Sequence, residues 1–454
     1  MLASEKIGRL LFKLSVPAII GMMVHGLYNL VDTIFVGQFT GILGIGGITI
    51  AFPIQMIMMG IGMTIGIGGA SLISRRMGER DNEGASLALG NMVALSLVTG
   101  ILCMIAGLAF MDPLLRLFGA TDSLMPNAEA YIMVILIGSP VITFSMVASS
   151  SARAEGNAKV AMNTMLIGAI LNIALDPVFI VFLDLGVRGA AIATVLSITA
   201  SSIFLLRYYL SGKSEITFRL RQMRLKAGIV REIFAVGISD FARTAAMSLT
   251  SALFNNILRT LGGELPIATF GVIFRVMSFV FMPMIGIAQG AQPILGFNYG
   301  AKQFRRVKKS LHLANRSATA ISVVGFLVFF IFPTPILRIF NDDPQLIAMG
   351  KYAMRMLAIG LPLVGYQAIG TSLFQAIGKA KPAVFLAMSR QVLFLIPMVI
   401  ILSKIFGLTG VWTSFPAADI VSFIVTFMMV TYEMKRLTHH PEQEMSTASF
   451  QGKA

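Results

Sequence analysis

The stretch LNIALDP, residues 171–177, decides the fold class, because it places a carboxylate, Asp176, inside a long apolar run. Asp32 has the same setting near the start of the chain, in YNLVD, residues 28–32. At membrane depth a carboxylate costs roughly 2.5–3.5 kcal/mol on insertion scales, so it usually marks an ion pathway or relay. The two acids therefore predict a membrane protein whose function depends on them.

The composition supports this interpretation along the whole chain. The 454 residues are 56% hydrophobic and 13% charged, with a mean hydropathy of +0.82. Soluble domains carry about 25% charged residues. Apolar runs of about 20 residues, each long enough to span a bilayer, recur between short polar breaks. A transmembrane β-barrel would instead show alternating segments of about ten residues, so the chain is predicted to be an all-α integral membrane protein.

The runs predict about twelve transmembrane helices, arranged as two six-helix bundles around a central cavity. The expected spans are 11–36, 45–74, 85–110, 127–152, 160–183, 188–210, 232–258, 266–297, 311–333, 346–376, 383–403 and 409–432. The expected domains are an N-terminal bundle (1–210), a cytoplasmic linker (211–231), a C-terminal bundle (232–437) and a disordered cytoplasmic tail (438–454).

The distribution of basic residues predicts the orientation of the chain. If the N-terminus lies inside, 27 of the 36 Lys and Arg fall in inner segments and 7 in outer segments, and Arg243 and Arg275 fall within spans. Cytoplasmic loops carry an excess of Lys and Arg. Both termini are therefore expected in the cytoplasm of a multi-pass protein of the plasma or inner membrane.

The two halves of the sequence repeat each other. LRLF at 115–118 recurs as LRIF at 337–340, and AEGNAK at 154–159 recurs as AIGKAK at 376–381, both 222 residues later. A steady offset over most of the chain indicates an internal duplication. Because each half holds an even number of spans, the repeat is parallel, with its axis along the membrane normal, as in many transporters.

Several oxygen-bearing side chains can meet around the two acids. Tyr28 and Asp32 are four residues apart, as are Asn172 and Asp176, so each pair shares a helix face. Thr194 can face the same pocket if the fifth and sixth spans are neighbours. Oxygen ligands suit a hard cation such as Na⁺, and carboxylates alone suit a proton. The structural alternative is that each acid merely hydrogen-bonds a neighbouring helix.

The repeat favours an ion site over this alternative. The positions that match Asp32 and Asp176 in the second half are Asn256 and Met398. If the acids only held helices together, both bundles would need them. Pro17 and Pro177 interrupt the backbone hydrogen bonds of the first and fifth spans, so they are candidate bending points or static kinks.

The second half carries its own intramembrane charges, Asp240, Arg243, Arg275 and Asp419, which are candidates for substrate binding or for structural pairing. Asp240 and Arg243 are three residues apart and can pair with each other. The 30 Met and 33 Phe permit a loose apolar cavity between the halves.

Other function classes lack their motifs. The net charge of +15 comes from short loops, so we expect no nucleic-acid partner. Cys103 is the only cysteine, and the four His have no metal-ligand spacing. No Walker P-loop, nucleophile elbow or HExxH pair occurs in the sequence. We therefore expect no enzyme, no cofactor, and an ion gradient as the energy source.

Several of these segments resemble the multidrug and toxic compound extrusion (MATE) transporters. The resemblance covers about residues 8–436 and rests on a set of motifs in order: LSVP (14–17), YNLVDTIFVG (28–37), RAEGNAK (153–159) and NIALDP (172–177). It implies efflux of amphipathic, often cationic, drugs in exchange for inward H⁺ or Na⁺ by alternating access. A monomer in contact with membrane lipid is expected.

Within the family the sequence is similar to the prokaryotic branch with a cation site in the N-terminal bundle. The resemblance places that site at Tyr28, Asp32, Asn172, Asp176 and Thr194, with Pro17 as the bending point. The only metal it implies is Na⁺ at the last four of these residues. Another branch keeps acids in its seventh and tenth helices, and here the tenth span has none. The choice between proton and sodium stays open.

Two other functions fit the sequence less well. A flippase for lipid-linked saccharides or another amphiphile would share the bundle but need basic residues facing a diphosphate, for which Arg243 and Arg275 are the candidates. An intramembrane enzyme or channel would need a reactive cluster or a continuous pore, for which the sequence shows no signal.

Overall fold

A computed structural model describes residues 1–340 and 342–439. The described residues form helices without any strand. The first half contains α1 (Ile7–Gly78), α2 (Asn82–Ala109), α3 (Met111–Leu117), α4 (Met125–Ala154), α5 (Ala158–Asp176), the π-helix η1 (Pro177–Phe182) and α6 (Gly186–Leu210). After the 3-10 turn η2 (Leu220–Met223), the second half contains α7 (Ala227–Gly262), α8 (Glu264–Gly300), α9 (Phe304–Ile331), α10 (Pro333–Arg338), α11 (Pro344–Ala376), α12 (Ala380–Met388), the π-helix η3 (Ser389–Leu395) and α13 (Ile396–His439).

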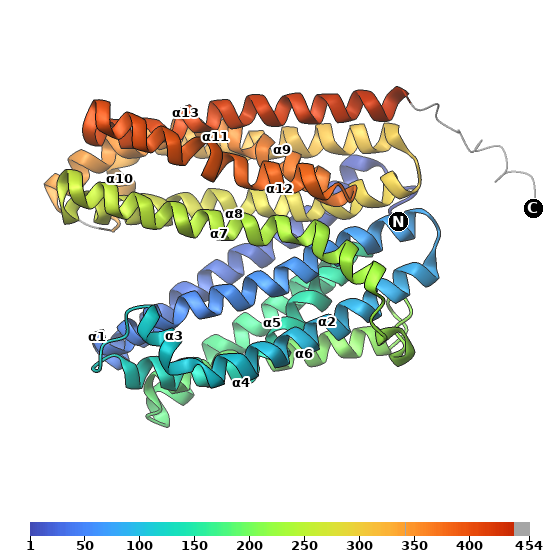
Figure 1. The fold of residues 1–454 in the computed structure, drawn as a ribbon, viewed down its shortest axis with the longest axis horizontal. Coiled ribbons are helices and arrows are strands. Elements are labelled where there is room, and N and C mark those ends of the chain that lie inside the picture. Colours follow the sequence, from blue (N-terminus) through green and yellow to red (C-terminus); the bar gives the residue numbers. More distant parts are fainter. Residues whose placement is uncertain (341, 440–454) are drawn as a thin grey trace, which may run out of the picture.

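The helices run side by side along the long axis of the molecule in two bundles (Figure 1). Within the described residues, ten segments are long and apolar enough to cross a membrane. One of them, Ala380–Leu437, is broken by non-helical backbone at Gly407, and α7 adds a more polar 36-residue helix. The prediction of about twelve spans in two bundles is confirmed. The predicted tail lies mostly outside the described residues, and its first two residues belong to α13.

Backbone geometry shows the internal repeat directly. Gly41 and Gly263, 222 residues apart, have φ of 67° and 74° and join consecutive spans. Arg80 and Lys302, also 222 apart, have φ of 61° and 56°. Left-handed backbone is uncommon for a residue with a side chain. Its recurrence at one offset therefore indicates that both halves turn at the same points of the chain.

The two bundles touch at the end where the N-terminus lies and diverge toward the opposite end (Figure 1). At the touching end the helices approach backbone to backbone: a Cβ on Gly68 would collide with the carbonyl of Ile233, and one on Gly237 with the carbonyl of Thr64. An ion pair of 2.8 Å joins Arg75 to Glu232 across the same contact. Small residues allow such close helix packing in membranes.

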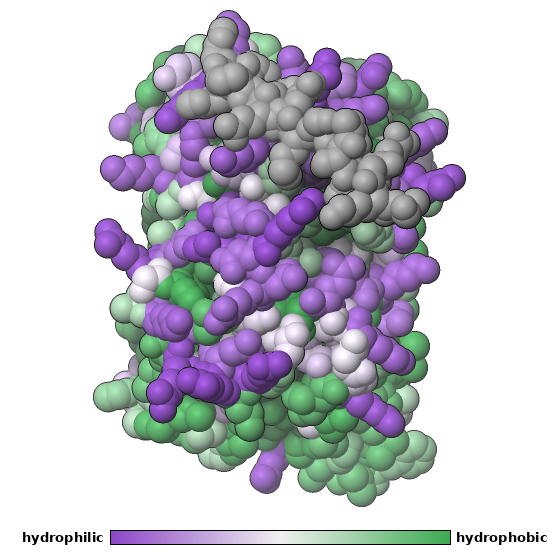
Figure 2. Space-filling model, turned by 90° about the vertical axis from the view of Figure 1, so that its right-hand side faces the viewer, coloured by the Kyte–Doolittle hydropathy of each residue, from purple (hydrophilic) through white to green (hydrophobic). Residues whose placement is uncertain are grey.

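Polar side chains gather at this touching end (Figure 2). The segment expected to link the two halves is bound there to the first half. Ser214 Oγ and the backbone N–H of Glu215 donate hydrogen bonds to the carboxylate of Glu155, at 2.6 and 3.1 Å. Burial raises the pKa of this carboxyl group, against the effect of its hydrogen bonds with Ser214 and Tyr208. Asn91 accepts a hydrogen bond of 2.7 Å from the backbone of Lys226, which directly precedes α7.

Candidate functional site

The first half brings oxygen atoms together around Asp176. Asp176 ends α5, where Pro177 begins the π-helix η1, and its side chain is completely buried. Asn172, one turn earlier, donates to Asp176 Oδ1 at 3.3 Å and to Thr194 Oγ1 on α6 at 3.4 Å. Three of the five predicted site residues therefore share one pocket.

Asp32 on α1 lies near this pocket, close enough for its charge to interact with that of Asp176. Tyr131 on α4 is buried and close enough to Asp32, Asp176 and Tyr28 for their charges to act on it, and its hydroxyl forms a hydrogen bond with Gln55. All five predicted residues thus come from helices that converge here. Tyr131 and Gln55 were missed by the sequence analysis, because a tyrosine or glutamine in an apolar helix carries no charge signal.

Three oxygens of this pocket are buried and have no hydrogen-bond donor among the described residues: Asp32 Oδ1, Asn172 Oδ1 and Asp176 Oδ2. A buried acceptor without a partner costs about 1–3 kcal/mol. Oxygens of carboxylate and amide groups are the ligands that hard cations prefer, and a proton on either carboxylate would also supply a donor. The donor set therefore fits H⁺ or Na⁺ and offers no soft ligand.

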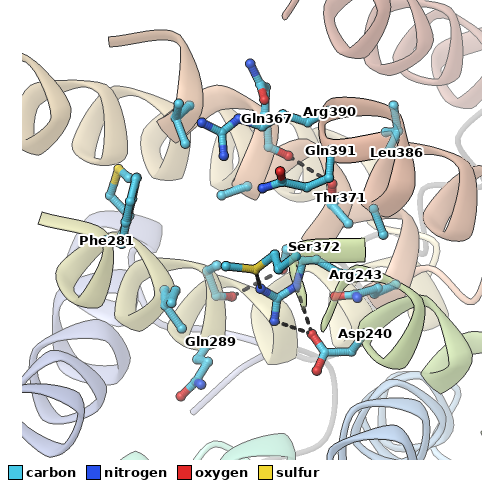
Figure 3. Close-up of a pocket in the computed structure, with 18 of the residues that line it drawn as sticks. Asp240, Arg243, Phe281, Gln289, Gln367, Thr371, Ser372, Leu386, Arg390 and Gln391 are labelled. Carbon is cyan, nitrogen blue, oxygen red and sulfur yellow. Dashed lines mark hydrogen bonds and ion pairs between the residues drawn. The ribbon is translucent and has the colours of Figure 1, made fainter. Parts of the chain in front are cut away.

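A cavity of about 300 Å³ lies in the second half, against α1 and α4 of the first (Figure 3). Its aromatic wall includes Phe254, Phe270 and Phe415, whose ring centroids lie 4.9–6.0 Å apart. Its polar wall comes mainly from α8, α11 and η3, with the amides Gln289, Gln292, Gln367, Gln375 and Gln391. The cavity is amphipathic, because aromatic rings, amides and charged groups all line it.

Two ion pairs lie on this polar wall. Arg243 Nη2 and Asp240 Oδ1 are 2.6 Å apart, as the three-residue spacing indicated. Asp419 pairs with Arg390, with Nε and Oδ1 also 2.6 Å apart. From the sequence, Arg390 was counted among the basic residues of the inner segments, but it lies in the π-helix η3 and lines the cavity.

The other basic residues near the cavity differ from the sequence-based interpretation. Arg275 is exposed on α8 and does not line the cavity. Arg153, at the end of α4, does line it. Pro17 is buried inside α1 without a local break in helical backbone, whereas the non-helical residue of α1 is Gly41.

Comparison with known proteins matches this architecture to one family. The MatE family model matches residues 17–178 and 241–401, one segment in each half. The chain belongs to the MatE family. It is accordingly a multi-pass membrane transporter and not an enzyme.

Curated MATE relatives include the multidrug export protein MepA of Staphylococcus haemolyticus, 27% identical over 426 residues and 93% of each chain. MepA of Staphylococcus aureus is 26% identical over 424 residues, again 93% of each chain. A solved structure described as the outward-facing conformation of a multidrug resistance MATE transporter superposes with a TM-score of 0.91, at 28% identity, covering 96% of this chain and 98% of that one. A MATE in a bent conformation gives 0.91 at 29% identity, covering 96% and 97%.

Proposed function

We propose that this protein is a secondary active exporter of amphipathic organic compounds, driven by inward movement of H⁺ or Na⁺. The observation that carries the proposal is the group of three buried, unpartnered oxygens on Asp32, Asn172 and Asp176. They provide a place where an ion from a gradient can bind. The name of the MepA relatives supports multidrug cargo for this chain as part of the proposal.

In the proposed cycle, ion and cargo bind different halves and communicate by alternating access. The two bundles meet at the end where the N-terminus lies and diverge toward the other, which the proposal takes as the open end. The positive-inside pattern makes that open end extracellular. An ion bound at Asp32 and Asp176 disfavours the cargo-bound outward state, and by reciprocal linkage cargo is released as the ion enters.

The proposal keeps the amphipathic part of the cargo description that the resemblance implied. Among the described residues, the cavity offers no free carboxylate to a cationic cargo, because both of its carboxylates, Asp240 and Asp419, are already paired with arginine. The same arginines favour the flippase for a lipid-linked saccharide as the second candidate. Toxicity on gene deletion, rather than drug sensitivity, would support that candidate.

Reconstitution in liposomes tests the proposal. Dye efflux is followed under an imposed proton gradient and, separately, a sodium gradient. We expect Asp32→Asn and Asp176→Asn to insert normally and lose gradient-driven efflux, since an amide can neither take up a proton at neutral pH nor supply an anionic ligand. Asp184→Asn, an exposed acid of the same half, serves as the control. Full transport by both site variants would refute the assignment.

A further inference from the structure

The charges that face the second-half cavity are predominantly positive. In the Asp240–Arg243 pair the aspartate side chain is 7% exposed and the arginine 39%. In the Asp419–Arg390 pair the values are 4% and 23%. Each carboxylate therefore lies behind its guanidinium, and cargo entering the cavity meets the arginine first.

The buried carboxylates are held in place behind these arginines. Asp419 packs against Gly360 of α11 so closely that a Cβ there would collide with its Oδ2. Both the Nε and Nη2 groups of Arg243 donate to Asp240, at 3.1 and 2.6 Å. Hydrogen bonds between two ionised groups are roughly twice as strong as those between neutral groups. A cationic cargo would have to displace an arginine to reach either acid.

Arg153 adds a third positive charge without a matching acid. Its Nη1 and Nη2 groups donate to the neutral hydroxyls of Ser149 and Ser150, at 3.1 and 2.8 Å. No carboxylate of the described residues forms an ion pair with it. With two neutralised pairs and one uncompensated guanidinium, the lining carries a net charge of +1.

The order of residues along the helices separates this charge from the aromatic rings. Along α7, Asp240 and Arg243 come before Thr250 and Phe254, counted from the end where the halves touch. Arg153, at the last turn of α4, lies toward that same end. Figure 3 shows Arg243 and Arg390 on opposite sides of the pocket. A ligand that fits has an apolar body among the phenylalanines and a polar head near Arg243 and Arg153.

We propose that the cavity recognises an acidic group, a carboxylate or phosphate, on its amphipathic cargo, and that Arg153 supplies the positive charge that binds it. The inference rests on the proposed export function and names its substrate class. Guanidinium groups match both anions with paired N–H donors. Zwitterionic drugs with a carboxylate meet this requirement, and simple organic cations do not.

Matched probes test the inference on the purified full-length protein without any gradient. 1-Pyrenebutyrate, 1-pyrenebutyramide and 1-pyrenebutylammonium share one apolar body and differ in the head group. Their affinities are measured by fluorescence titration in detergent, with protein-free micelles subtracted. We expect the butyrate to bind about tenfold more tightly than the amide, the size of one charge-assisted hydrogen bond. The ammonium probe is expected to bind most weakly.

Variants assign this preference to Arg153. Arg153→Gln is expected to bind all three probes with about the affinity of the wild type for the amide, and Arg153→Lys to retain part of the preference. Arg275→Gln, which removes an exposed arginine outside the cavity lining, is expected to keep the full preference. Size-exclusion profiles and thermal unfolding report whether each variant is folded. If Arg153→Gln does not fold, Arg153→Lys tests the role of the guanidinium.

Competition separates the two sources of the acidic group. Displacement of pyrenebutyrate by farnesyl phosphate, with farnesol as control, assigns the group to a lipid phosphate, and no displacement assigns it to small carboxylates. The inference is overturned if the wild type binds the ammonium probe as tightly as the butyrate, or if Arg153→Gln weakens all probes equally. Loss of gradient-driven efflux with an intact preference would refute the proposed function alone.

Discussion

At the residue scale, Asn172 organises the first-half site. One amide nitrogen donates to both Asp176 and Thr194, so it fixes the carboxylate relative to the neighbouring helix α6. Its own carbonyl oxygen remains buried without a donor. The amide nitrogen of Asn172 therefore positions the carboxylate of Asp176, and its Oδ1 can itself contact an ion. An apolar side chain can do neither.

We expect Asn172→Ala to raise the ion concentration needed for half-maximal efflux by about tenfold, the usual size of the loss when a group that orients a ligand is removed. The measurement is dye efflux from liposomes over a series of pH or Na⁺ gradients. Asn163→Ala, which alters an exposed asparagine on the same helix, is the matched control. An unchanged ion dependence in Asn172→Ala would exclude this role.

At the element scale, the glycine contacts between α1 and α7 hold the touching end of the bundles together. Gly68 and Gly237 each lie against a backbone carbonyl of the other helix, where no side chain fits. Carbonyl groups within helices cannot move aside as the tip of a flexible side chain can. These contacts therefore depend on the absence of a Cβ at both positions.

Gly237→Val is expected to destabilise the touching end by about 1–3 kcal/mol, the typical cost of overpacking. Spin labels at Glu79→Cys and Arg305→Cys, in a Cys103→Ser background, should show a larger mean distance between the halves. Gly271→Val is the control, because a Cβ at Gly271 meets no atom within 4 Å. Equal distances in both variants would show that the close contact does not hold this end closed.

Periodic and charged features of the sequence predicted most of the elements. Apolar runs predicted the spans, and the charges of Asp32 and Asp176 within those runs predicted the candidate ion site. Arg390 falls within the expected span 383–403 but was counted with the basic residues of the inner segments, so its place on the cavity wall was not predicted. Tyr131 and Gln55 join the site only through the packing of α4 and α1, which residue spacing within one helix cannot reveal.

At the scale of the whole molecule, charge is distributed unequally between the two ends. Polar side chains gather on the face viewed in Figure 2, at the end where the bundles touch. Most of the Lys and Arg residues in the loops belong to this end. The asymmetry gives the protein one orientation in the membrane, and that orientation decides whether the open end of the cavity faces outward.

Labelling of intact cells tests the orientation. In a Cys103→Ser background, a membrane-impermeant maleimide is expected to modify Asp122→Cys, which is exposed at the divergent end. Lys213→Cys, exposed at the touching end, should react only after permeabilisation. The reverse pattern would place the termini outside and invert the proposed direction of transport.

The bound segment between the halves limits how they can move. From Ser214 to Lys226 it is anchored at two separate points on the first half, through Glu155 and Asn91. Because α7 starts at the next residue, almost no slack chain remains to lengthen during a transport cycle. If the bundles change their relative position during transport, as the proposed cycle requires, the chain would have to bend at or after Lys226, where α7 begins.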